Sequence, residues 1–295
     1  MEIRQLQTFK AVADCRSFHK AAHAIHYAQS TVSAQIIALE TELGVQLFER
    51  LGRRIVLTEA GDSLYQYACK MIDLADAARA EVAERTHLTG ALTIRVPESF
   101  CVHRLTPVIA RFHQRLPNVK LRFITCAQEG LARDLKKGVT DLAFLLAESI
   151  HSKDLTAEVL GTERLVLVAA PDHPLAKLDS VKTERLADHT LLLSRVDCSY
   201  RRILEQMLQY LKCEPAMVLE FNSVAAIISN VVAGLGVTLI PEVAAAALVK
   251  SKKLAVLPWT EDELEVAQLM IWHHDKWLTP VLNAFMDATR EILKT

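Results

Sequence analysis

The sequence predicts an α/β chain with three parts: a small, mainly helical N-terminal domain, one long connecting helix, and a larger domain in which strands alternate with helices. Three observations support this prediction. Apolar residues repeat at helical spacing through residues 1–57, a heptad pattern follows in residues 58–89, and β-branched runs alternate with amphipathic segments in residues 90–295. A chain of 295 residues is long enough for two or three domains.

The composition excludes several classes of protein. The net charge is −1, so the chain is neither a basic protein that coats nucleic acid nor an acidic solvating segment. Its six cysteines lie far apart without a C-x-x-C pair, which excludes a disulfide scaffold and a cysteine zinc cluster and favours a reducing compartment. No apolar signal segment follows Met1, and the longest apolar run, Val231 to Ile240, is too short to cross a bilayer. We therefore expect a cytoplasmic protein without membrane contact.

The N-terminal residues are expected to form short helices and a hairpin. Ser17 is a favourable N-cap for a helix over Phe18–Ile25, and a short turn separates this helix from a second one over Gln29–Glu42. Gly44 follows the second helix, where a left-handed residue is favoured. The segment Arg50–Leu57 combines a glycine turn, a β-branched pair and three arginines, which predicts a small β-hairpin.

A single long helix is expected from Thr58 to about His87. Thr58 is a good N-cap, and Glu59 in the first turn complements the helix dipole. Apolar residues at steps of four and three form a heptad seam along a rod of about 45 Å, which indicates pairing with a second helix. A helix that lies on its own domain is the alternative. The seam consists of Ala60, Leu64, Tyr67, Met71, Leu74, Ala78 and Val82.

The remaining residues predict parallel sheets with helices on both faces, arranged as two α/β lobes that share a cleft. The last strand, Val266–Trp272, and the last helix, from about Trp277 to Leu293, are expected to return to the first sheet. Lobe I then comprises about 90–162 and 267–295, and lobe II about 163–266. The other predicted strands are Ala91–Val96, Val119–Thr125, Leu142–Leu146, Leu165–Ala169, Leu191–Leu193, Met217–Phe221 and Val237–Ile240, with helices that include Leu105–Leu116, Tyr200–Leu211 and Val224–Ala233.

The common enzyme signatures are missing from the sequence. It contains no G-x-x-x-x-G-K-[ST], no H-E-x-x-H and no G-x-S-x-G pattern. Gly234-Leu235-Gly236 lacks the third glycine of a dinucleotide-binding loop and instead predicts a helix end. His273-His274-Asp275 could suggest a metal, but adjacent residues at a strand end point to opposite faces and cannot easily chelate one ion. We expect no catalytic residues, no cofactor and no metal.

The predicted helix over Gln29–Glu42 has the features of a DNA-recognition helix. A helix that enters the major groove presents amide and hydroxyl side chains at its N-terminal end, where its backbone amides also meet phosphates. Through residue 64, seven basic residues balance seven acidic ones, so binding must depend on local placement and on a dimer that doubles the contacts. The residues expected to contact double-stranded DNA are Gln29, Ser30, Thr31, Ser33 and Gln35 of the helix and Arg50, Arg53 and Arg54 of the hairpin.

Several segments match a known family in order and spacing. In the first sixty or so residues they are Ala21-Ala22, Gln29 to Ile36, Leu39-Glu40, Leu43-Gly44, Leu47 to Arg50, Arg53-Arg54 and Thr58 to Gly61. Further along they are Gly138-x-x-Asp141-Leu142-Ala143, His173-Pro174-Leu175, and Ala233 to Val237 with Pro241. On these residues the chain resembles the LysR-type transcriptional regulators, and the resemblance covers nearly its whole length.

This resemblance implies a winged helix-turn-helix over residues 1–57, a linker helix that dimerises over 58–89, and a two-lobed effector domain, similar to periplasmic binding proteins, over 90–295. It also implies a tetramer, regulation of nearby genes in response to a small molecule in the cleft, and RNA polymerase as a further partner. Two positions depart from the family pattern. Ala28 stands where Thr or Ser commonly precedes the recognition helix, which removes a cap worth about 1 kcal/mol, and Ala34 stands where many members carry arginine.

An effector is expected beyond the carboxyl ends of the strands, near helix N-termini. Free amides at helix starts favour an anion, and Arg195, Arg201 and Arg202 add positive charge to one of these loops, so we expect a small carboxylate or another anionic metabolite. In similar family members a segment like Cys198-Ser199-Tyr200-Arg201 lies at the cleft. Serines that serve only as helix caps are the alternative. The residues expected to bind the effector are Ser99, Phe100, Cys126, Gln128, Ser194, Cys198, Ser199, Arg201, Asn222 and Ser223.

Two other functions are weighed against this one. The spacing of Cys198 and Cys213 is similar to that in the peroxide-sensing branch of the family, which would make the protein a thiol-based redox-responsive regulator. A helix over Tyr200–Leu211 would hold the two residues about 20 Å apart, well beyond the ~6 Å that a disulfide requires. A cytoplasmic two-lobed solute-binding protein or enzyme is the other alternative, and the missing signal peptide and catalytic motifs argue against it.

Overall fold

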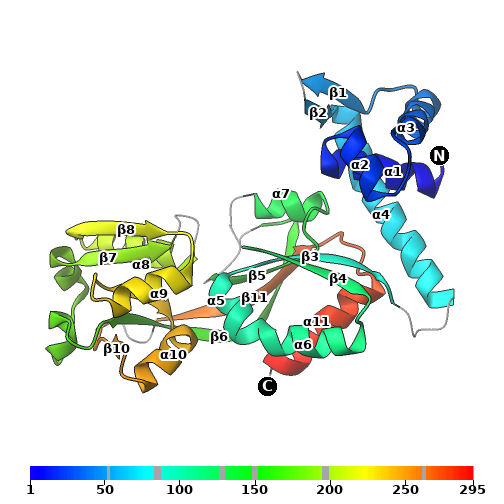
Figure 1. Cartoon of the computed structure of the whole chain (residues 1–295). Coiled ribbons are helices and arrows are strands. Elements are labelled where there is room, and N and C mark those ends of the chain that lie inside the picture. The colour runs from blue at the N-terminus through cyan, green and yellow to red at the C-terminus, as the bar shows by residue number, and fades with distance from the viewer. Residues whose placement is uncertain are drawn as a thin grey trace.

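The computed structural model describes residues 1–51, 54–82, 88–125, 130–147, 152–194, 199–260 and 264–294. Along the chain it shows a helical N-terminal domain, a long helix and two α/β lobes, which confirms the predicted fold class (Figure 1). Lobe I lies next to the long helix, and lobe II lies at the far end of the molecule. The C-terminus returns to lobe I.

Three helices build the N-terminal domain around one apolar core. Ser17 caps the second helix, as predicted, because its hydroxyl accepts a hydrogen bond from the Lys20 amide at 3.3 Å. Gly44 ends the third helix with a φ of 69°, the left-handed conformation that favours glycine. The helices are α1 (Ile3–Cys15), α2 (Phe18–Ala24) and α3 (Gln29–Leu43). The core consists of Leu6, Phe9, Val12, Ala21, Ala22, Val32, Ile36, Leu39, Leu47, Tyr65, Ala68 and Cys69.

A two-stranded antiparallel hairpin, β1 (Phe48–Leu51) and β2 (Arg54–Leu57), follows α3. The Glu40 carboxylate of α3 accepts hydrogen bonds from the amides of Leu47 and Phe48 at 2.7 and 3.3 Å. Phe48 then packs its ring 5.3 Å from that of Phe9 between centroids. The Glu40 carboxylate and the Phe48 ring therefore help to hold the hairpin to the helices.

The long helix α4 (Glu59–Val82) begins as predicted, with the Thr58 hydroxyl accepting a hydrogen bond from the Gly61 amide at 3.0 Å. Gly61 is required here because a Cβ atom would lie 2.1 Å from the Leu47 carbonyl oxygen. The predicted continuation of this helix over residues 83–87 lies outside the described residues.

Five strands form the main sheet of lobe I, and helices cover both of its faces. Alternate residues of β5 belong to different cores: Phe144 packs with α6 and α11, whereas Leu145 packs with α7 on the opposite face (Figure 1). The strands are β3 (Gly90–Val96), β4 (Val119–Thr125), β5 (Leu142–Ala147), β6 (Leu155–Ala169) and β11 (Glu265–His273). The helices are α5 (Glu98–Phe100), a π-helical turn (Cys101–Leu105), α6 (Thr106–Arg115), α7 (Leu131–Lys136) and α11 (Pro280–Leu293).

The prediction of parallel sheets is wrong for part of this sheet. β3 pairs in parallel with β4 and β5, whereas β11 pairs antiparallel with both β5 and β6. β11 enters lobe I from lobe II at the opposite end, so it can run antiparallel to β5 without a crossover helix. The strand–helix alternation in the sequence therefore predicted only the β3, β4 and β5 portion correctly.

Both lobes share the strand β6. It pairs with β11 as far as Arg164, and from Leu165 onward it pairs with β9 (Thr238–Pro241) and β10 (Ala255–Val256). The sequence predicted only its last five residues, because its first ten residues mix polar and apolar side chains and are half exposed. A second sheet of lobe II pairs two strands in parallel, β7 (Thr190–Ser194) and β8 (Met217–Phe221).

Three α-helices pack on these strands of lobe II, and one of them, α10, was not predicted. Gly234 and Gly236 follow the end of α9 (Val224–Val232) and lead into β9, which confirms the prediction that the Gly-Leu-Gly segment is a helix end. At Gly236 a Cβ atom would lie 2.1 Å from the Thr190 carbonyl oxygen, so this approach requires glycine. The helices are α8 (Ser199–Tyr210), α9 (Val224–Val232) and α10 (Glu242–Lys250), with two 3₁₀ turns at Pro174–Lys177 and Thr183–Asp188. Within the described ranges, no helix is both long and apolar enough to cross a membrane.

The carboxylate of Glu158 ties β6 to the C-terminal helix. Arg290 donates to it at 2.8–3.2 Å, Lys294 lies 2.7 Å away, and these bonds lower the pKa of Glu158 to about 2. We expect Glu158→Gln to lower the free energy of unfolding by about 2 kcal/mol at pH 7. Because the folded pKa lies below the ordinary 4.5, the difference from wild type should shrink as pH falls from 4.5 towards 2.

Urea titrations at several pH values measure this difference. Glu291→Gln is the matched control, since Glu291 is half exposed and pairs only at the surface with Arg111, and it should change stability by less than about 0.5 kcal/mol. An effect of Glu158→Gln that persists unchanged at pH 2 would contradict the assignment of this ion cluster.

Candidate functional site

The first turn of α3 presents the polar side chains that the sequence singled out. Gln29, Ser30 and Thr31 are exposed, whereas Ser33 is half-buried. Gln35 is also half-buried, and its amide oxygen accepts a hydrogen bond from the Thr8 hydroxyl at 2.6 Å. Gln35 therefore helps to hold α3 against α1, and the open surface is made by the residues that precede it.

The N-terminus of α3 has no side-chain cap. Ala28 occupies the capping position with φ −69° and ψ 144°, and it supplies no oxygen to the first-turn amides, as the sequence predicted. These amides are therefore available from this side to an external anion such as a phosphate.

The hairpin arginines are only partly described. Arg50 and Arg54 lie on β1 and β2, where Arg50 pairs with Ile55 and Leu51 with Arg54. The side chains of Arg50 and Arg54, and all of Arg53, lie outside the described residues.

The predicted effector residues come from the carboxyl ends of two parallel strand pairs. Val96 of β3 pairs with Thr125 of β4 at one edge, and Ser194 of β7 pairs with Phe221 of β8 at the other. A helix begins just beyond three of these strand ends, namely α5 after β3, α8 after β7 and α9 after β8. This is the arrangement in which open α/β sheets bind ligands.

One side chain joins the two lobes at these edges. Glu98, the first residue of α5, reaches the N-terminus of α9 and accepts hydrogen bonds from the Val224 amide at 2.9 Å and the Ala225 amide at 3.3 Å. The Ser223 hydroxyl donates to the same carboxylate at 3.0 Å. Glu98 was not among the site residues predicted from the sequence, because nothing local shows that it meets a residue 125 positions away.

The predicted effector residues that the structure describes differ in their surroundings. Ser99 and Ser194 have hydroxyl oxygens that are buried and have no hydrogen-bond partner among the described residues. Phe100 lies in the core and stacks on Phe144 at 5.4 Å between ring centroids, so it supports the fold. Asn222 is exposed at the end of β8. Cys126, Gln128, Cys198 and the side chain of Ser199 lie outside the described residues.

Arg201, one of the three arginines predicted to add positive charge, is buried and already engaged. Its guanidinium donates to Glu205 at 2.7 Å, to Glu220 at 2.7 Å and to the Ser194 carbonyl at 2.5 Å. Burial alone would lower the pKa of Arg201, but Glu205 and Glu220 more than offset it and raise the pKa. In this conformation Arg201 holds α8 against β7 and β8, and its charge is balanced within lobe II.

The linker helix α4 contacts lobe I through a buried ammonium group. The Lys276 Nζ atom lies 2.7 Å from Asp141 and 3.9 Å from Asp73 of α4. Burial lowers the pKa of Lys276, but the two carboxylates more than offset this effect, and the pKa is raised above 10.5. Asp141 also accepts a hydrogen bond from the Thr93 amide of β3 at 2.7 Å. Lys276 therefore connects the linker helix, through Asp141, to strand β3 of lobe I.

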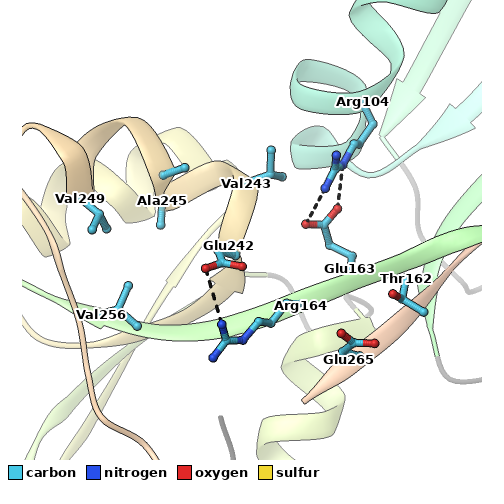
Figure 2. A pocket seen from close by; sticks show the side chains of 11 residues that line it. Arg104, Thr162, Glu163, Arg164, Glu242, Val243, Ala245, Val249, Val256 and Glu265 are labelled. Atoms are coloured by element: carbon cyan, nitrogen blue, oxygen red, sulfur yellow. Dashed lines mark hydrogen bonds and ion pairs between the residues drawn. The ribbon is translucent and has the colours of Figure 1, made fainter. Parts of the chain in front are cut away.

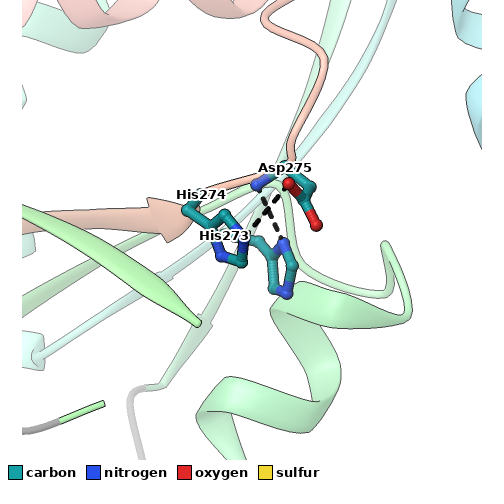
Figure 3. A group of neighbouring side chains, drawn as sticks. All are labelled: His273, His274 and Asp275. Atoms are coloured by element: carbon teal, nitrogen blue, oxygen red, sulfur yellow. Dashed lines mark hydrogen bonds and ion pairs between the residues drawn. The ribbon is translucent and has the colours of Figure 1, made fainter. Parts of the chain in front are cut away.

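His273, His274 and Asp275 cluster at the end of β11 (Figure 3). The expectation that the two histidines face opposite ways is wrong, because β11 ends at His273 and the rings stack at 4.8 Å. Three of the four ring nitrogens have a polar neighbour, and the buried His273 Nε2 atom has no hydrogen-bond partner among the described residues. The His273 Nδ1 atom accepts from the Asp275 amide at 3.2 Å, which leaves the proton of the neutral ring on Nε2. Both His274 nitrogens face oxygen atoms, Nδ1 the Asp154 carbonyl at 3.0 Å and Nε2 the Asp275 carboxylate at 3.1 Å.

A cavity of about 540 Å³ lies where β6 passes between the lobes (Figure 2). Arg104 donates to the buried Glu163 at 2.9 and 3.2 Å, and Gln268 donates to the same carboxylate at 3.1 Å. Arg164 faces Glu242 across the cavity at 3.8 Å. These two ion pairs link lobe I to β6 and β6 to α10.

Two family profiles match the chain. The profile described as the bacterial regulatory helix-turn-helix protein, lysR family, matches residues 3–62, and the LysR substrate binding domain matches residues 85–294. The HTH-type transcriptional regulator YwqM of Bacillus subtilis (strain 168) is 39% identical over 295 residues, which is the full length of both chains.

The chain belongs to the LysR family of transcriptional regulators. It is accordingly a DNA-binding regulator with an effector-binding domain, and not an enzyme.

Solved structures of similar fold support the architecture of this LysR-type regulator. A full-length OxyR variant from Pseudomonas aeruginosa has a TM-score of 0.73 at 23% identity, and the match covers 98% of this chain and 95% of that one. Full-length CbnR in complex with its target DNA has a TM-score of 0.62 at 24% identity and covers 99% of each chain. These likenesses establish the shared fold.

The uncapped start of α3 in this LysR-type regulator leads to a first site prediction. Ala28→Ser should stabilise α3 by about 1 kcal/mol, because the exposed position already has the extended backbone of an N-cap. Amide exchange of α1–α3 measures the change. Ala34→Ser is the matched control: it puts the same side chain on the exposed face within α3, where serine should cost up to about 0.5 kcal/mol. Equal effects of the two variants would show that capping is not involved.

The junction with α4 leads to a second prediction. Lys276→Met should lower the free energy of unfolding by about 3 kcal/mol, because the Asp141 and Asp73 carboxylates lose the ammonium group between them. Urea unfolding at pH 7 measures this loss. Lys153→Met, at an exposed lysine of lobe I, should change stability by less than about 0.5 kcal/mol. A loss from Lys276→Met no larger than that of the control would contradict the proposed junction.

Proposed function

We propose that this LysR-type regulator binds its target DNA through α3 and the β1–β2 hairpin, under the control of a small anionic effector held between the two lobes. The proposal rests on two helix N-termini, one of which is free of any side-chain cap while the other binds a carboxylate. The start of α3 is uncapped at an exposed surface, and the start of α9 binds a carboxylate at the junction of the lobes. Both are sites that favour an anion, a phosphate in one case and an effector in the other.

We infer that the DNA contacts come from the residues that the sequence singled out. The exposed Gln29, Ser30 and Thr31 are suited to base edges and phosphates, and Ser33 and Gln35 follow on the same helix. Arg50, Arg53 and Arg54 of the hairpin are assigned to phosphate or minor-groove contacts. The balanced charge of the N-terminal domain makes these local contacts the main source of affinity.

The effector site is assigned to Ser99, Ser194, Asn222 and Ser223, together with Cys126, Gln128, Cys198 and Ser199. The buried, unpartnered hydroxyls of Ser99 and Ser194 support this assignment, since buried polar groups ordinarily have a partner that a ligand would supply here. Phe100 and Arg201 are assigned to the support of the site, because one packs in the core and the other is bound by two carboxylates.

Self-association through α4 is part of the proposal. Tyr67, Met71 and Leu74 of the predicted seam are 58%, 37% and 52% exposed, which is unusual for apolar side chains in a row along one helix. Ala60 and Leu64 of the same seam instead pack on the N-terminal core, so the pairing face is confined to the second half of the seam. A tetramer and contact with RNA polymerase follow from the family resemblance.

The division into residues 1–57, 58–89 and 90–295, with the lobe boundaries near 162/163 and 266/267, is retained as the proposed domain organisation. A cytoplasmic location is proposed because the protein acts on DNA. A thiol switch is not favoured: Cys213 is buried, its thiol points to the carbonyls of Thr183 and Glu184 at 3.7 and 3.6 Å, and burial raises its pKa.

Ser30→Asp tests the DNA interface. An acidic residue in the first turn of α3 should leave the helix intact or slightly more stable, because it complements the helix dipole, yet it should repel phosphates. We expect DNA affinity to fall at least about tenfold, measured by footprinting upstream of the protein's own gene across a salt series. Ser180→Asp, which adds the same charge at an exposed site in lobe II, should leave affinity unchanged.

Wild-type protection of patches spaced by whole helical turns, with a steep salt dependence, is the expected result. No protection by wild-type protein at low salt, on that DNA or on genomic fragments, would overturn the proposed DNA function. Equal affinity of wild type and Ser30→Asp would show that the start of α3 does not face the DNA.

A further inference from the structure

We propose that Glu98 is a built-in ligand of the effector domain: its carboxylate fills the anion site of lobe II, and a carboxylate effector acts by displacing it. The inference rests on the proposed function only for the identity of the displacing molecule. The occupied site itself is an observed contact between residues of the two lobes.

The contact has the features of a bound anion. The Glu98 Oε2 atom accepts from the Val224 amide at 2.9 Å, and Oε1 accepts from the Ala225 amide at 3.3 Å and the Ser223 hydroxyl at 3.0 Å. Two backbone amides at the start of a nine-residue helix and one hydroxyl are the donors that a free carboxylate would use. Ser223, at the capping position, does not cap the helix with its own side chain, which leaves the amides to Glu98.

The site accommodates one carboxylate at a time. The same two amides cannot each bond to a second carboxylate at these distances, and two like charges on one helix end would repel. Arg201, one of the arginines predicted to lie at the effector site, is bound to Glu205 and Glu220, so its charge is already balanced in this conformation. An anionic effector that uses the start of α9 must therefore move Glu98 away.

Displacement would change the contact between the lobes. Glu98 belongs to lobe I and follows β3 after Pro97, while Ser223 and α9 belong to lobe II. With Glu98 bound, the lobes are joined through a side chain of the protein. With an effector bound, the same amides are joined to a molecule that belongs to neither lobe. The exchange replaces one link between the lobes by another.

The proposal is tested on the full-length protein with acetate as the probe. Amide hydrogen exchange is followed at Val224 and Ala225 in wild type, Glu98→Ala and Glu98→Gln. We expect exchange at these amides to be about tenfold faster in Glu98→Ala and intermediate in Glu98→Gln, which keeps one acceptor oxygen. Millimolar sodium acetate, compared with sodium chloride at equal ionic strength, should slow exchange in Glu98→Ala and have little effect in wild type.

Glu214→Ala is the matched control, because Glu214 is an exposed glutamate of lobe II, and it should behave as wild type with and without acetate. Unchanged exchange at Val224 and Ala225 in Glu98→Ala, or no protection by acetate in that variant, would overturn the proposal. Glu98→Gln guards against misfolding of Glu98→Ala, since it preserves the length and shape of the side chain.

DNA footprinting of the same proteins separates this inference from the proposed function. Acetate protection in Glu98→Ala together with an absence of DNA binding by wild type would uphold the anion site and reject the DNA function. DNA binding by wild type without acetate protection in Glu98→Ala would do the reverse.

Discussion

The arrangement of both lobes depends on the continuous strand β6 and its antiparallel pairing with β11. The ladder pairs Leu155–Arg164 of β6 with Glu265–His273 of β11. From Leu165 onward, β6 continues into lobe II, where it pairs with β9. Because β6 is one unbroken strand that belongs to both sheets, the lobes cannot slide past each other. They can change their relative orientation only by a twist of β6 at the point where its partner changes from β11 to β9. Contacts elsewhere between the lobes, such as that of Glu98 with α9, are free to form and break around this fixed connection.

The buried positive charges of Arg201 and Lys276 are balanced by carboxylates within the protein. Arg201 lies against Glu205 and Glu220, and Lys276 lies between Asp73 and Asp141. The two proposed functional surfaces differ in whether a side chain already binds the amides of the helix N-terminus. The start of α3 is uncapped because Ala28 has no side-chain acceptor, whereas the start of α9 is closed by a carboxylate from the other lobe. The loss of a serine or threonine at Ala28 weakens the helix, but it leaves the amides open to a phosphate.

Periodicity predicted the elements well wherever one face of an element is buried by its neighbours. The helices from Phe18 and Gln29, the cap at Thr58 and the strands β3, β4 and β8 follow from patterns within about ten residues of sequence. The candidate site was harder to predict, because its key bonds join distant segments. Glu98 meets α9 across 125 residues, and the half-exposed first part of β6 has no clear alternation. Of the partners of Arg201, only Glu205 stands at a spacing of four, which a helix pattern can reveal.

The strand β3 links the two polar junctions of the effector domain. Near its middle, the Thr93 amide donates to Asp141, which holds Lys276 beside Asp73 of the linker helix α4. At its end, Pro97 leads directly into Glu98 and its contact with α9. A strand buried in a sheet moves as a rigid element, since its backbone is bonded to β4 on one side and β5 on the other. A shift of β3 that accompanies the release of Glu98 would therefore also act on Asp141, and through Lys276 on the helix that carries the DNA-binding domain.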